Sequence, residues 1–374
     1  MELRKFKDGL NISPLGFGAM RFPIDEDKPS NINVEKSCEM LDYAFEHGVN
    51  YFDTAYMYHD YASEAFVGKA LARYPREKFY LATKLPPWNI DKKEDLQRLF
   101  DGQLSRCGVD YFDFYLLHCV TRSTLPTFEK FGAYEFLREQ QKKGKLRYLG
   151  FSIHDNVMLM DELLEKYEFD FGQIQLNYLD WDQLNSKGLY EALYRRKIPA
   201  IIMEPVRGGV LANLPGESAK ILHSADPQHS QASWAMRFAG ELPGVLTVLS
   251  GMSTLEQVKD NIATYTDLVP LTSGEREVIN RAVEAYRKNT AIPCTVCGYC
   301  MPCPVGVNIP QSLGIYNSLK NGGNIDDFCM EYVHIGKGSQ PKDCTSCGTC
   351  LARCPQQIDI PKWMEEIAQV YNKE

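Results

Sequence analysis

Between Leu15 and about Ala263 the chain alternates short, apolar, β-rich runs with amphipathic helical stretches. Eight strand candidates lie at residues 15–20, 50–55, 79–85, 112–118, 147–152, 172–176, 200–205 and 246–252. Eight strands separated by helices within about 250 residues are typical of a parallel (β/α)8 barrel, the TIM barrel. An open, doubly wound sheet also satisfies the same periodicity. We expect the closed barrel.

Two flanking segments define the limits of this expected barrel. An Asp-Gly pair at residues 8–9, with apolar Phe6 and Ile12 beside it, predicts a hairpin that closes the barrel floor. At residues 271–289 a polar helix follows Ser273, which we expect to cap it. We therefore assign residues 1–272 to the barrel, 273–290 to a connecting helix and 291–374 to a second domain.

Composition narrows the functional classes. The chain has 374 residues, and its 44% hydrophobic content is sufficient for a packed core. Its 41 basic and 49 acidic side chains give a net charge of −8, so no broad basic face for nucleic acid is expected. Charged residues occupy the N-terminus where a signal peptide would be apolar, and no stretch has the character of a membrane span. We expect a cytoplasmic protein without nucleic-acid or membrane partners.

Eight of the twelve cysteines form two similar blocks near the C-terminus. The second block has the spacing C-x2-C-x2-C-x3-C-P and contains Cys344, Cys347, Cys350 and Cys354. This spacing is that of bacterial two-cluster ferredoxins, where the fourth cysteine binds the other cluster. The first block contains Cys294, Cys297, Cys300 and Cys303, and its last cysteine comes one residue early.

These blocks predict a small, mainly α-helical, ferredoxin-like domain with two [4Fe–4S] clusters and crossed ligation. One cluster would bind Cys294, Cys297, Cys300 and Cys354, and the other would bind Cys303, Cys344, Cys347 and Cys350. Clustered cysteines in a reducing compartment favour metal over disulfides. A pair of four-thiolate zinc sites is the alternative, although zinc sites rarely use three consecutive two-residue steps.

Four titratable residues follow consecutive strands of the expected barrel, where such barrels place their chemistry. They are Asp53 and Tyr58 after the second strand, Lys84 at the end of the third and His118 at the end of the fourth. Each alone has an ordinary explanation, as a cap, a loop aromatic, an exposed strand end or a core histidine. Together they predict a proton-transfer site, because an ammonium group beside a phenol lowers the phenol pKa from about 10.

The segments that carry these residues, "GVNYFDTAYMY", "YLATKL" and "FDFYLLH", resemble signature segments of the aldo-keto reductase superfamily. The resemblance covers roughly residues 1–265. It implies that Tyr58 protonates a substrate carbonyl that accepts hydride from a reduced nicotinamide. Lys84 would support Tyr58, and His118 would orient the carbonyl.

The same resemblance implies a nicotinamide dinucleotide site. The matching positions are Gly18, Met20, Ser152, Gln173, Glu204, Pro205, Arg207, Gly208, Gly209, Gly251, Met252, Gln257 and Asn261. Ser152 and Gln173 match residues that hold the carboxamide, and Asn261 matches an adenine contact. The family's basic residues for a 2′-phosphate are absent at residues 251, 252 and 257, which favours NADH over NADPH.

The expected cofactors of the two domains transfer different numbers of electrons. A nicotinamide in the barrel delivers two electrons as hydride, whereas each iron–sulfur cluster exchanges one. We therefore expect a reductase whose clusters relay electrons to or from a partner protein or a flavin. One alternative is an NAD(P)H-dependent reductase with structural or redox-sensing clusters. Another is a non-catalytic electron-carrier or regulatory subunit.

Overall fold

The computed structural model describes residues 1–26, 28–288, 292–294, 298–320 and 323–373. It divides into two compact units. The first unit comprises Met1–Pro205 and Ser233–Leu271, and the second comprises Val206–Ala232 and Thr272–Glu374. The second unit thus begins with residues 206–232, which lie within the expected barrel limits of 1–272, and resumes at Thr272.

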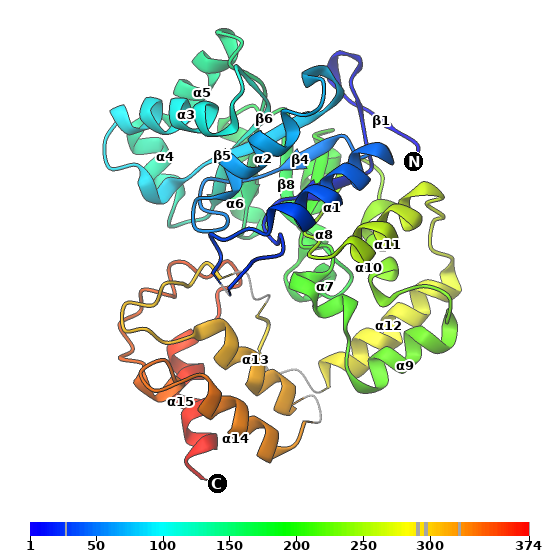
Figure 1. Cartoon of the computed structure of the whole chain (residues 1–374), viewed down its shortest axis with the longest axis vertical. Helices are drawn as coiled ribbons and strands as arrows, with labels where there is room; N and C mark the ends of the chain where they lie inside the picture. The colour runs from blue at the N-terminus through cyan, green and yellow to red at the C-terminus, as the bar shows by residue number, and fades with distance from the viewer. Residues whose placement is uncertain (27, 289–291, 295–297, 321–322, 374) are drawn as a thin grey trace. The chain divides into compact units, whose positions relative to one another are not determined.

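The first unit is built on a closed barrel of eight parallel strands (Figure 1), so the open-sheet alternative is wrong. The strands are β3 (Leu15–Gly18), β4 (Tyr51–Asp53), β5 (Tyr80–Leu85), β6 (Phe112–Val120), β7 (Leu146–Ile153), β8 (Phe171–Gln175), β9 (Ala200–Met203) and β10 (Val245–Ser250). They pair in chain order, and the pairing of Val248 with Leu15 joins β10 to β3 and closes the ring.

Helices alternate with these strands, as expected for a TIM barrel. They are α1 (Val34–Glu46), α2 (Ser63–Leu71), α3 (Glu94–Cys107), α4 (Leu125–Phe131), α5 (Ala133–Lys142), α6 (Val157–Lys166), α7 (Asp180–Gln183), α8 (Ser186–Arg195), α10 (Gln231–Gly240) and α11 (Leu255–Thr266). Short 3-10 turns lie at η2 (Arg76–Lys78) and η3 (Pro87–Asn89). Helix α1 illustrates why these segments are helical. The Asn33 side chain caps its first turn, and its buried face carries Met40, Leu41 and Ala44.

A hairpin precedes the barrel. Its strands β1 (Arg4–Lys5) and β2 (Asn11–Ile12) pair antiparallel around the turn η1 (Lys7–Gly9), where Asp8 and Gly9 have φ values of 55° and 76°. Phe6 and Ile12 are buried in one apolar cluster with Tyr51 and Phe171, which begin β4 and β8. The hairpin therefore fills the amino-terminal end of the barrel, and the carboxyl ends of the strands remain for a site.

The second unit is mainly α-helical. It contains η4 (Arg207–Ala212), α9 (Gly216–Ala225), α12 (Ser273–Arg287), α13 (Ile309–Lys320), α14 (Ile325–His334), η5 (Pro341–Asp343) and α15 (Ile360–Tyr371). Its core includes Tyr316 from α13, Tyr332 from α14 and Met364 from α15. Within the described residues, no helix combines the length and apolar character needed to cross a lipid bilayer.

The cap of α12 differs from the expectation by one residue. Thr272, not Ser273, is the N-cap: its side chain accepts a hydrogen bond from the Glu275 backbone N–H. The Glu275 carboxylate in turn accepts a hydrogen bond from the Thr272 backbone N–H. This reciprocal capping box satisfies two backbone donors, which explains why the helix begins at Ser273.

Candidate functional site

The carboxyl ends of three adjacent strands carry the four residues of the expected proton-transfer site. Asp53 ends β4, Lys84 lies near the end of β5, His118 lies near the end of β6, and Tyr58 follows in the loop after β4. Because β4 pairs with β5 and β5 pairs with β6, these ends lie side by side. The exposed fractions are 3% for Asp53, 1% for Lys84, 1% for His118 and 9% for Tyr58, so all four side chains are buried and the tyrosine is the most exposed of them.

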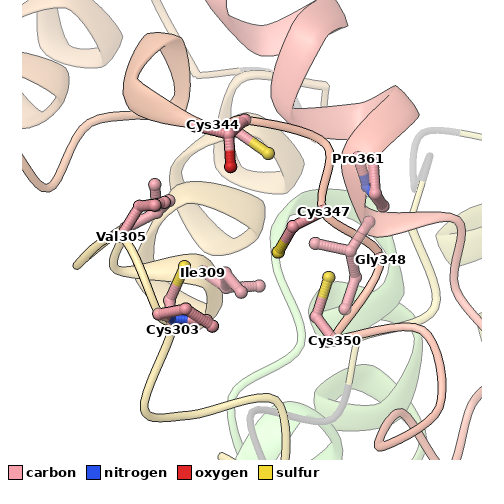
Figure 2. A pocket seen from close by; sticks show the side chains of 12 residues that line it. Cys303, Val305, Ile309, Cys344, Cys347, Gly348, Cys350 and Pro361 are labelled. Atoms are coloured by element: carbon pink, nitrogen blue, oxygen red, sulfur yellow. The ribbon is translucent and has the colours of Figure 1, made fainter.

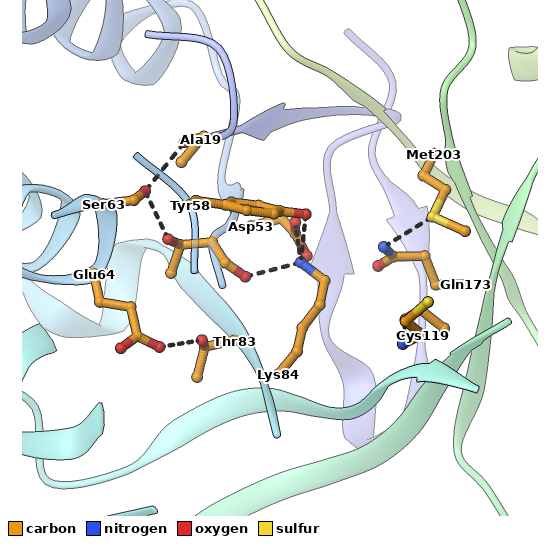
Figure 3. A network of polar contacts seen from close by, with 12 residues as sticks. Ala19, Asp53, Tyr58, Ser63, Glu64, Thr83, Lys84, Cys119, Gln173 and Met203 are labelled. Carbon is orange, nitrogen blue, oxygen red and sulfur yellow. Dashed lines mark hydrogen bonds and ion pairs between the residues drawn. The ribbon is translucent and has the colours of Figure 1, made fainter. Parts of the chain in front are cut away.

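The Lys84 ammonium group joins three of the local acceptors (Figure 3). Its Nζ donates to Asp53 Oδ1 at 2.6 Å, to the Thr54 carbonyl oxygen at 2.8 Å and to the Tyr58 hydroxyl at 3.4 Å. An ammonium group has three hydrogens, so these contacts use its full donor capacity. The structure therefore brings Asp53, Tyr58 and Lys84 together, with the lysine between the carboxylate and the phenol.

The electrostatics of the site keep Lys84 charged. Burial works to lower the pKa of Lys84, but the Asp53 carboxylate and then Tyr58 outweigh it, and the lysine pKa is raised overall. Burial has the opposite effect on the carboxyl group: it raises the pKa of Asp53, although Lys84 acts to lower that pKa. A buried ammonium group beside a buried carboxylate holds its proton at neutral pH, so Lys84 presents a positive charge to Tyr58.

His118 faces the same tyrosine. Its ring centroid lies 6.3 Å from that of Tyr58 and 5.5 Å from that of Trp88, with the rings nearly perpendicular in both pairs. Burial, followed by the positive charge of Lys84 and by His154, lowers the pKa of His118 well below its usual value. His118 is therefore a neutral imidazole at neutral pH, a form that donates a hydrogen bond without carrying charge.

The end of β6 departs from regular pairing at this histidine. Its register against β7 shifts between Leu117 and Val120, and Cys119 has a φ of 53°. An irregularity of this kind changes the directions in which successive side chains point. The Cys119 backbone N–H donates to Ser152 Oγ at 2.8 Å, which ties the irregular segment to β7.

Behind Lys84 lies a buried polar network that the sequence does not reveal. Glu64 Oε1 on α2 accepts hydrogen bonds from Thr83 Oγ1 and from Gln103 Nε2, both at 2.6 Å. Gln103 Nε2 also donates to the Lys84 carbonyl oxygen at 3.0 Å, and Arg106 forms an ion pair with Glu64. These contacts fix the backbone that carries the lysine. The available signal was Glu64 itself, an acidic residue followed directly by the apolar run Ala65–Val67.

We expect Asp53→Asn to destabilise the barrel by about 3–5 kcal/mol, because it leaves the buried Lys84 ammonium without its counter-charge. The free energy of unfolding, from urea denaturation followed by circular dichroism, measures this loss. Glu139→Gln is the matched control: it breaks an exposed ion pair with Lys142 and is expected to cost about 1 kcal/mol or less. Equal losses in the two variants would contradict a structural role for the buried pair.

Ser152 and Gln173, the expected carboxamide contacts, are direct register partners on β7 and β8. Gln173 Nε2 donates to Met203 Sδ at 3.6 Å, a weak acceptor. Within the part of the chain that the structure describes, the buried Gln173 Oε1 has no hydrogen-bond partner. A buried amide oxygen without a donor is uncommon in proteins, and it fits a ligand that supplies an N–H group.

The other expected cofactor positions fall into three groups. Gly18 ends β3, where a Cβ would lie 3.3 Å from the Ser250 carbonyl oxygen, and Met20 follows in the next loop. Glu204 and Pro205 follow β9, whereas Arg207, Gly208 and Gly209 belong to η4 in the second unit. Gly251 and Met252 follow β10, and Gln257 and Asn261 lie on α11. Asn261 Nδ2 donates to Ser250 Oγ at 3.0 Å.

The second unit brings the cysteines of the two blocks together in two pockets. The first pocket is lined by Cys303, Cys344, Cys347 and Cys350, with apolar Val305 and Ile309 beside them (Figure 2). The second is lined by Cys294, Cys300 and Cys354. Cys297 lies outside the described residues. The last cysteine of each block therefore lies with the other block.

Four cysteines around one pocket are the donor set of an iron–sulfur cluster. Among the described residues, no three cysteine, histidine or acidic side chains are placed to hold one metal ion. A tetrahedral zinc site requires four sulfurs around one centre, whereas a [4Fe–4S] cube binds each thiolate at a different iron and so holds the sulfurs further apart. The apolar lining suits a site that limits solvent access.

Comparisons with known proteins agree with both halves of the chain. The model of the "Aldo/keto reductase family" matches residues 14–284, and that of the "4Fe-4S dicluster domain" matches residues 293–358. A probable aldo-keto reductase of Glycine max is 35% identical over 152 residues, which is 38% of this chain and less than half (42%) of that protein. A methylglyoxal reductase of Escherichia coli (strain K12) is 28% identical over 258 residues, covering 66% of this chain and 84% of that protein.

Solved structures show the same barrel. The holo form of an aldo-keto reductase from Bacillus halodurans superposes with a TM-score of 0.62 at 26% identity, covering 75% of this chain and 96% of that one. An aldo/keto reductase from Klebsiella pneumoniae, solved with NADP and acetate, gives a TM-score of 0.60 at 21% identity over 75% of this chain and 94% of that one. The chain belongs to the aldo/keto reductase family and carries a C-terminal 4Fe-4S dicluster domain.

Proposed function

We propose that this protein interconverts a carbonyl and an alcohol with a nicotinamide cofactor, and that Tyr58 is its general acid and base. The observation that carries the proposal is the Lys84 ammonium group, which contacts the Asp53 carboxylate on one side and the Tyr58 hydroxyl on the other. Family membership supports the reaction class, and the convergence of these side chains at the strand ends supports the residue roles.

Each side chain has a separate task in carbonyl reduction. Tyr58 donates its hydroxyl proton to the carbonyl oxygen, and the Lys84 charge stabilises the phenolate that remains. Neutral His118 donates a hydrogen bond to the same oxygen and so fixes its orientation. Asp53 keeps Lys84 protonated. A bound reduced nicotinamide supplies the hydride.

The nicotinamide would be held by residues of β7 and β8. Ser152 and the Gln173 amide would bind the carboxamide, which supplies the donor that Gln173 Oε1 lacks. Gly18, Met20, Glu204 and Pro205, which follow strand ends of the same barrel, are proposed as further contacts. For the pyrophosphate we propose Arg207, Gly208 and Gly209, and for the adenosine Gly251, Met252, Gln257 and Asn261.

For the C-terminal domain we propose two [4Fe–4S] clusters with crossed ligation. Cys303 would complete the set of Cys344, Cys347 and Cys350, and Cys354 would complete that of Cys294, Cys297 and Cys300. The shared pockets of Cys303 with the second block and of Cys354 with the first support this assignment. The domain limits of 1–272, 273–290 and 291–374 remain part of the proposal.

We further propose that the clusters relay electrons to or from a partner protein. Because hydride carries two electrons and each cluster exchanges one, the relay requires a two-electron to one-electron mediator such as a flavin, bound here or carried by the partner. Without that mediator the clusters would have a structural or redox-sensing role.

One anaerobic experiment on the cluster-loaded protein separates these roles. A panel of aldehydes and ketones with NADH or NADPH tests the barrel chemistry, and we expect turnover that requires no added flavin. Bleaching of cluster absorbance by NAD(P)H is expected only when FMN or FAD is present. Turnover without any flavin-dependent bleaching would reject a relay through a flavin bound by this chain and retain the reductase, whereas no turnover with any carbonyl in the panel would count against the reductase.

A further inference from the structure

The two cysteine blocks begin with the same seven-residue pattern, C-T-x-C-G-x-C, and differ at its two variable positions. The first block has Val296 and Tyr299 at these positions, and the second block has Ser346 and Thr349. The second block therefore carries two short hydroxyl side chains where the first carries an isopropyl group and a phenol ring. Because the three cysteines and their spacing are the same, these positions give the two clusters different surroundings.

The hydroxyl group of Thr349 lies beside a cysteine sulfur. Its Oγ1 is 3.5 Å from Cys347 Sγ, which is within hydrogen-bonding distance for sulfur. A thiol can donate or accept in such a pair, but a thiolate bound to iron has no hydrogen and only accepts. Thr349 is therefore the donor when a cluster is bound. Tyr299, at the matching position of the first block, has its hydroxyl at the far end of a rigid ring and lacks this short-range donor.

The contact belongs to the first pocket, where Cys347 lies with Cys303, Cys344 and Cys350 (Figure 2). A second donor reaches the same ligand set, because the Ser346 backbone N–H donates to Cys344 Sγ at 3.4 Å. A backbone N–H is available at the matching position of the first block as well, so this second contact does not require a particular side chain. The hydroxyl of Thr349 does.

A hydrogen bond to a ligand sulfur affects the two oxidation states of a cluster unequally. Reduction adds one negative charge to the cluster and its thiolates, so a donor stabilises the reduced state more than the oxidised state and raises the reduction potential. Asp343, directly before Cys344, acts in the opposite direction because it is acidic. Its Oδ2 accepts a hydrogen bond from the Gln340 backbone N–H at 3.0 Å. A substitution of Thr349 leaves that carboxylate in place and so measures the hydroxyl alone.

We propose that the Thr349 hydroxyl donates to the Cys347 thiolate and raises the reduction potential of the cluster in the first pocket. The cluster in the second pocket lacks this contribution, so the hydroxyl favours an electron on the first cluster over the second. The inference rests on the two [4Fe–4S] clusters proposed above and adds a residue that controls where a relayed electron resides. Thr349 acts through Cys347 and binds no iron itself.

Reduction potentials of the cluster-loaded protein test the proposal without requiring turnover. Thr349→Val keeps the β-branched shape and removes the hydroxyl, and Thr349 is only half-buried, so we expect the domain to remain folded. Electron paramagnetic resonance of samples poised at successive potentials gives the two midpoint potentials. We expect one of them to fall by about 59 mV, which corresponds to a roughly tenfold smaller equilibrium constant for one-electron reduction. The other should not move.

Two further variants distinguish the hydroxyl from packing. Thr349→Ser keeps the hydroxyl, loses only a methyl group and is expected to retain both midpoint potentials. Tyr299→Thr introduces a short hydroxyl side chain at the matching position of the first block. We expect it to raise the potential that Thr349→Val leaves unchanged.

Each remaining outcome decides against a specific part of the argument. If neither potential moves in Thr349→Val, the hydroxyl has no influence on the cluster and the proposal is overturned. An equal fall in Thr349→Ser would assign the effect to packing. Iron and labile sulfide are measured in every sample: if Thr349→Val loses its cluster, the absence of a rise in Tyr299→Thr overturns the proposal instead. If the unmodified protein binds no cluster, the proposed clusters fail first, and the inference about Thr349 fails with them.

Discussion

Tyr58→Phe is expected to lower kcat/KM for carbonyl reduction by about 10²- to 10⁴-fold, the contribution typical of a positioned general acid. The substitution removes one hydroxyl group, which accepts a 3.4 Å hydrogen bond from Lys84 Nζ. The Lys84 ammonium group keeps its shorter contacts to Asp53 and to the Thr54 carbonyl, so the barrel should remain folded. Steady-state reduction of the best aldehyde found in the carbonyl panel gives the rate.

The dinucleotide Kd provides an internal check, because a loss of proton transfer should leave cofactor binding within about twofold. Tyr61→Phe is the matched control: Tyr61 lies in the same loop, is 54% exposed and contacts Tyr56 by its ring, so its hydroxyl should not affect the rate. A Tyr58→Phe variant that keeps more than about a tenth of the rate would show that another group donates the proton.

The strands of the barrel could be predicted because each is a short apolar run bounded by turns, as expected for parallel strands covered on both faces. The closing of the strands into a barrel could not be predicted from such local patterns. It depends on the pairing of Val248 with Leu15, two residues more than 200 positions apart, and no local pattern encodes that register. The number of strands, rather than their periodicity, was the useful signal.

The position of the site followed from a general rule about barrels, but its surroundings did not. Asp53, Lys84 and His118 could be placed together because successive parallel strands end at the same rim. The contacts of Gln103 with Glu64 and with the Lys84 carbonyl depend on how α2 and α3 pack on the barrel.

The cysteine spacing indicated two iron–sulfur clusters because most ligands of each cluster lie close together in the sequence. The crossed ligation, in which the fourth cysteine of each block binds the other cluster, depends on contacts between distant segments. Cys303 comes one residue earlier than the pattern requires, so the crossed ligation that the sequence predicts departs from the bacterial spacing at this cysteine. The structure places it beside Cys344, Cys347 and Cys350.

Paired substitutions test the crossed ligation by the number of clusters that survive. Cys303→Ala combined with Cys347→Ala removes two ligands from one proposed site and none from the other. We therefore expect the reduced protein to keep the electron paramagnetic resonance signal of one intact [4Fe–4S] cluster, with half of the iron and labile sulfide. Cys300→Ala combined with Cys303→Ala removes one ligand from each site, so no site with four cysteines remains and neither signal should persist unchanged.

Ligation within each block predicts the reverse, because Cys300 and Cys303 would then belong to one cluster and Cys303 and Cys347 to two. The two double variants therefore exchange their outcomes between the hypotheses, and a general loss of stability cannot imitate that exchange. Cys329→Ala is the control, since Cys329 on α14 packs against the apolar core of the domain and lines neither pocket. It should retain both clusters. Survival of one intact cluster in Cys300→Ala/Cys303→Ala, with loss of both in Cys303→Ala/Cys347→Ala, would reject the crossed arrangement.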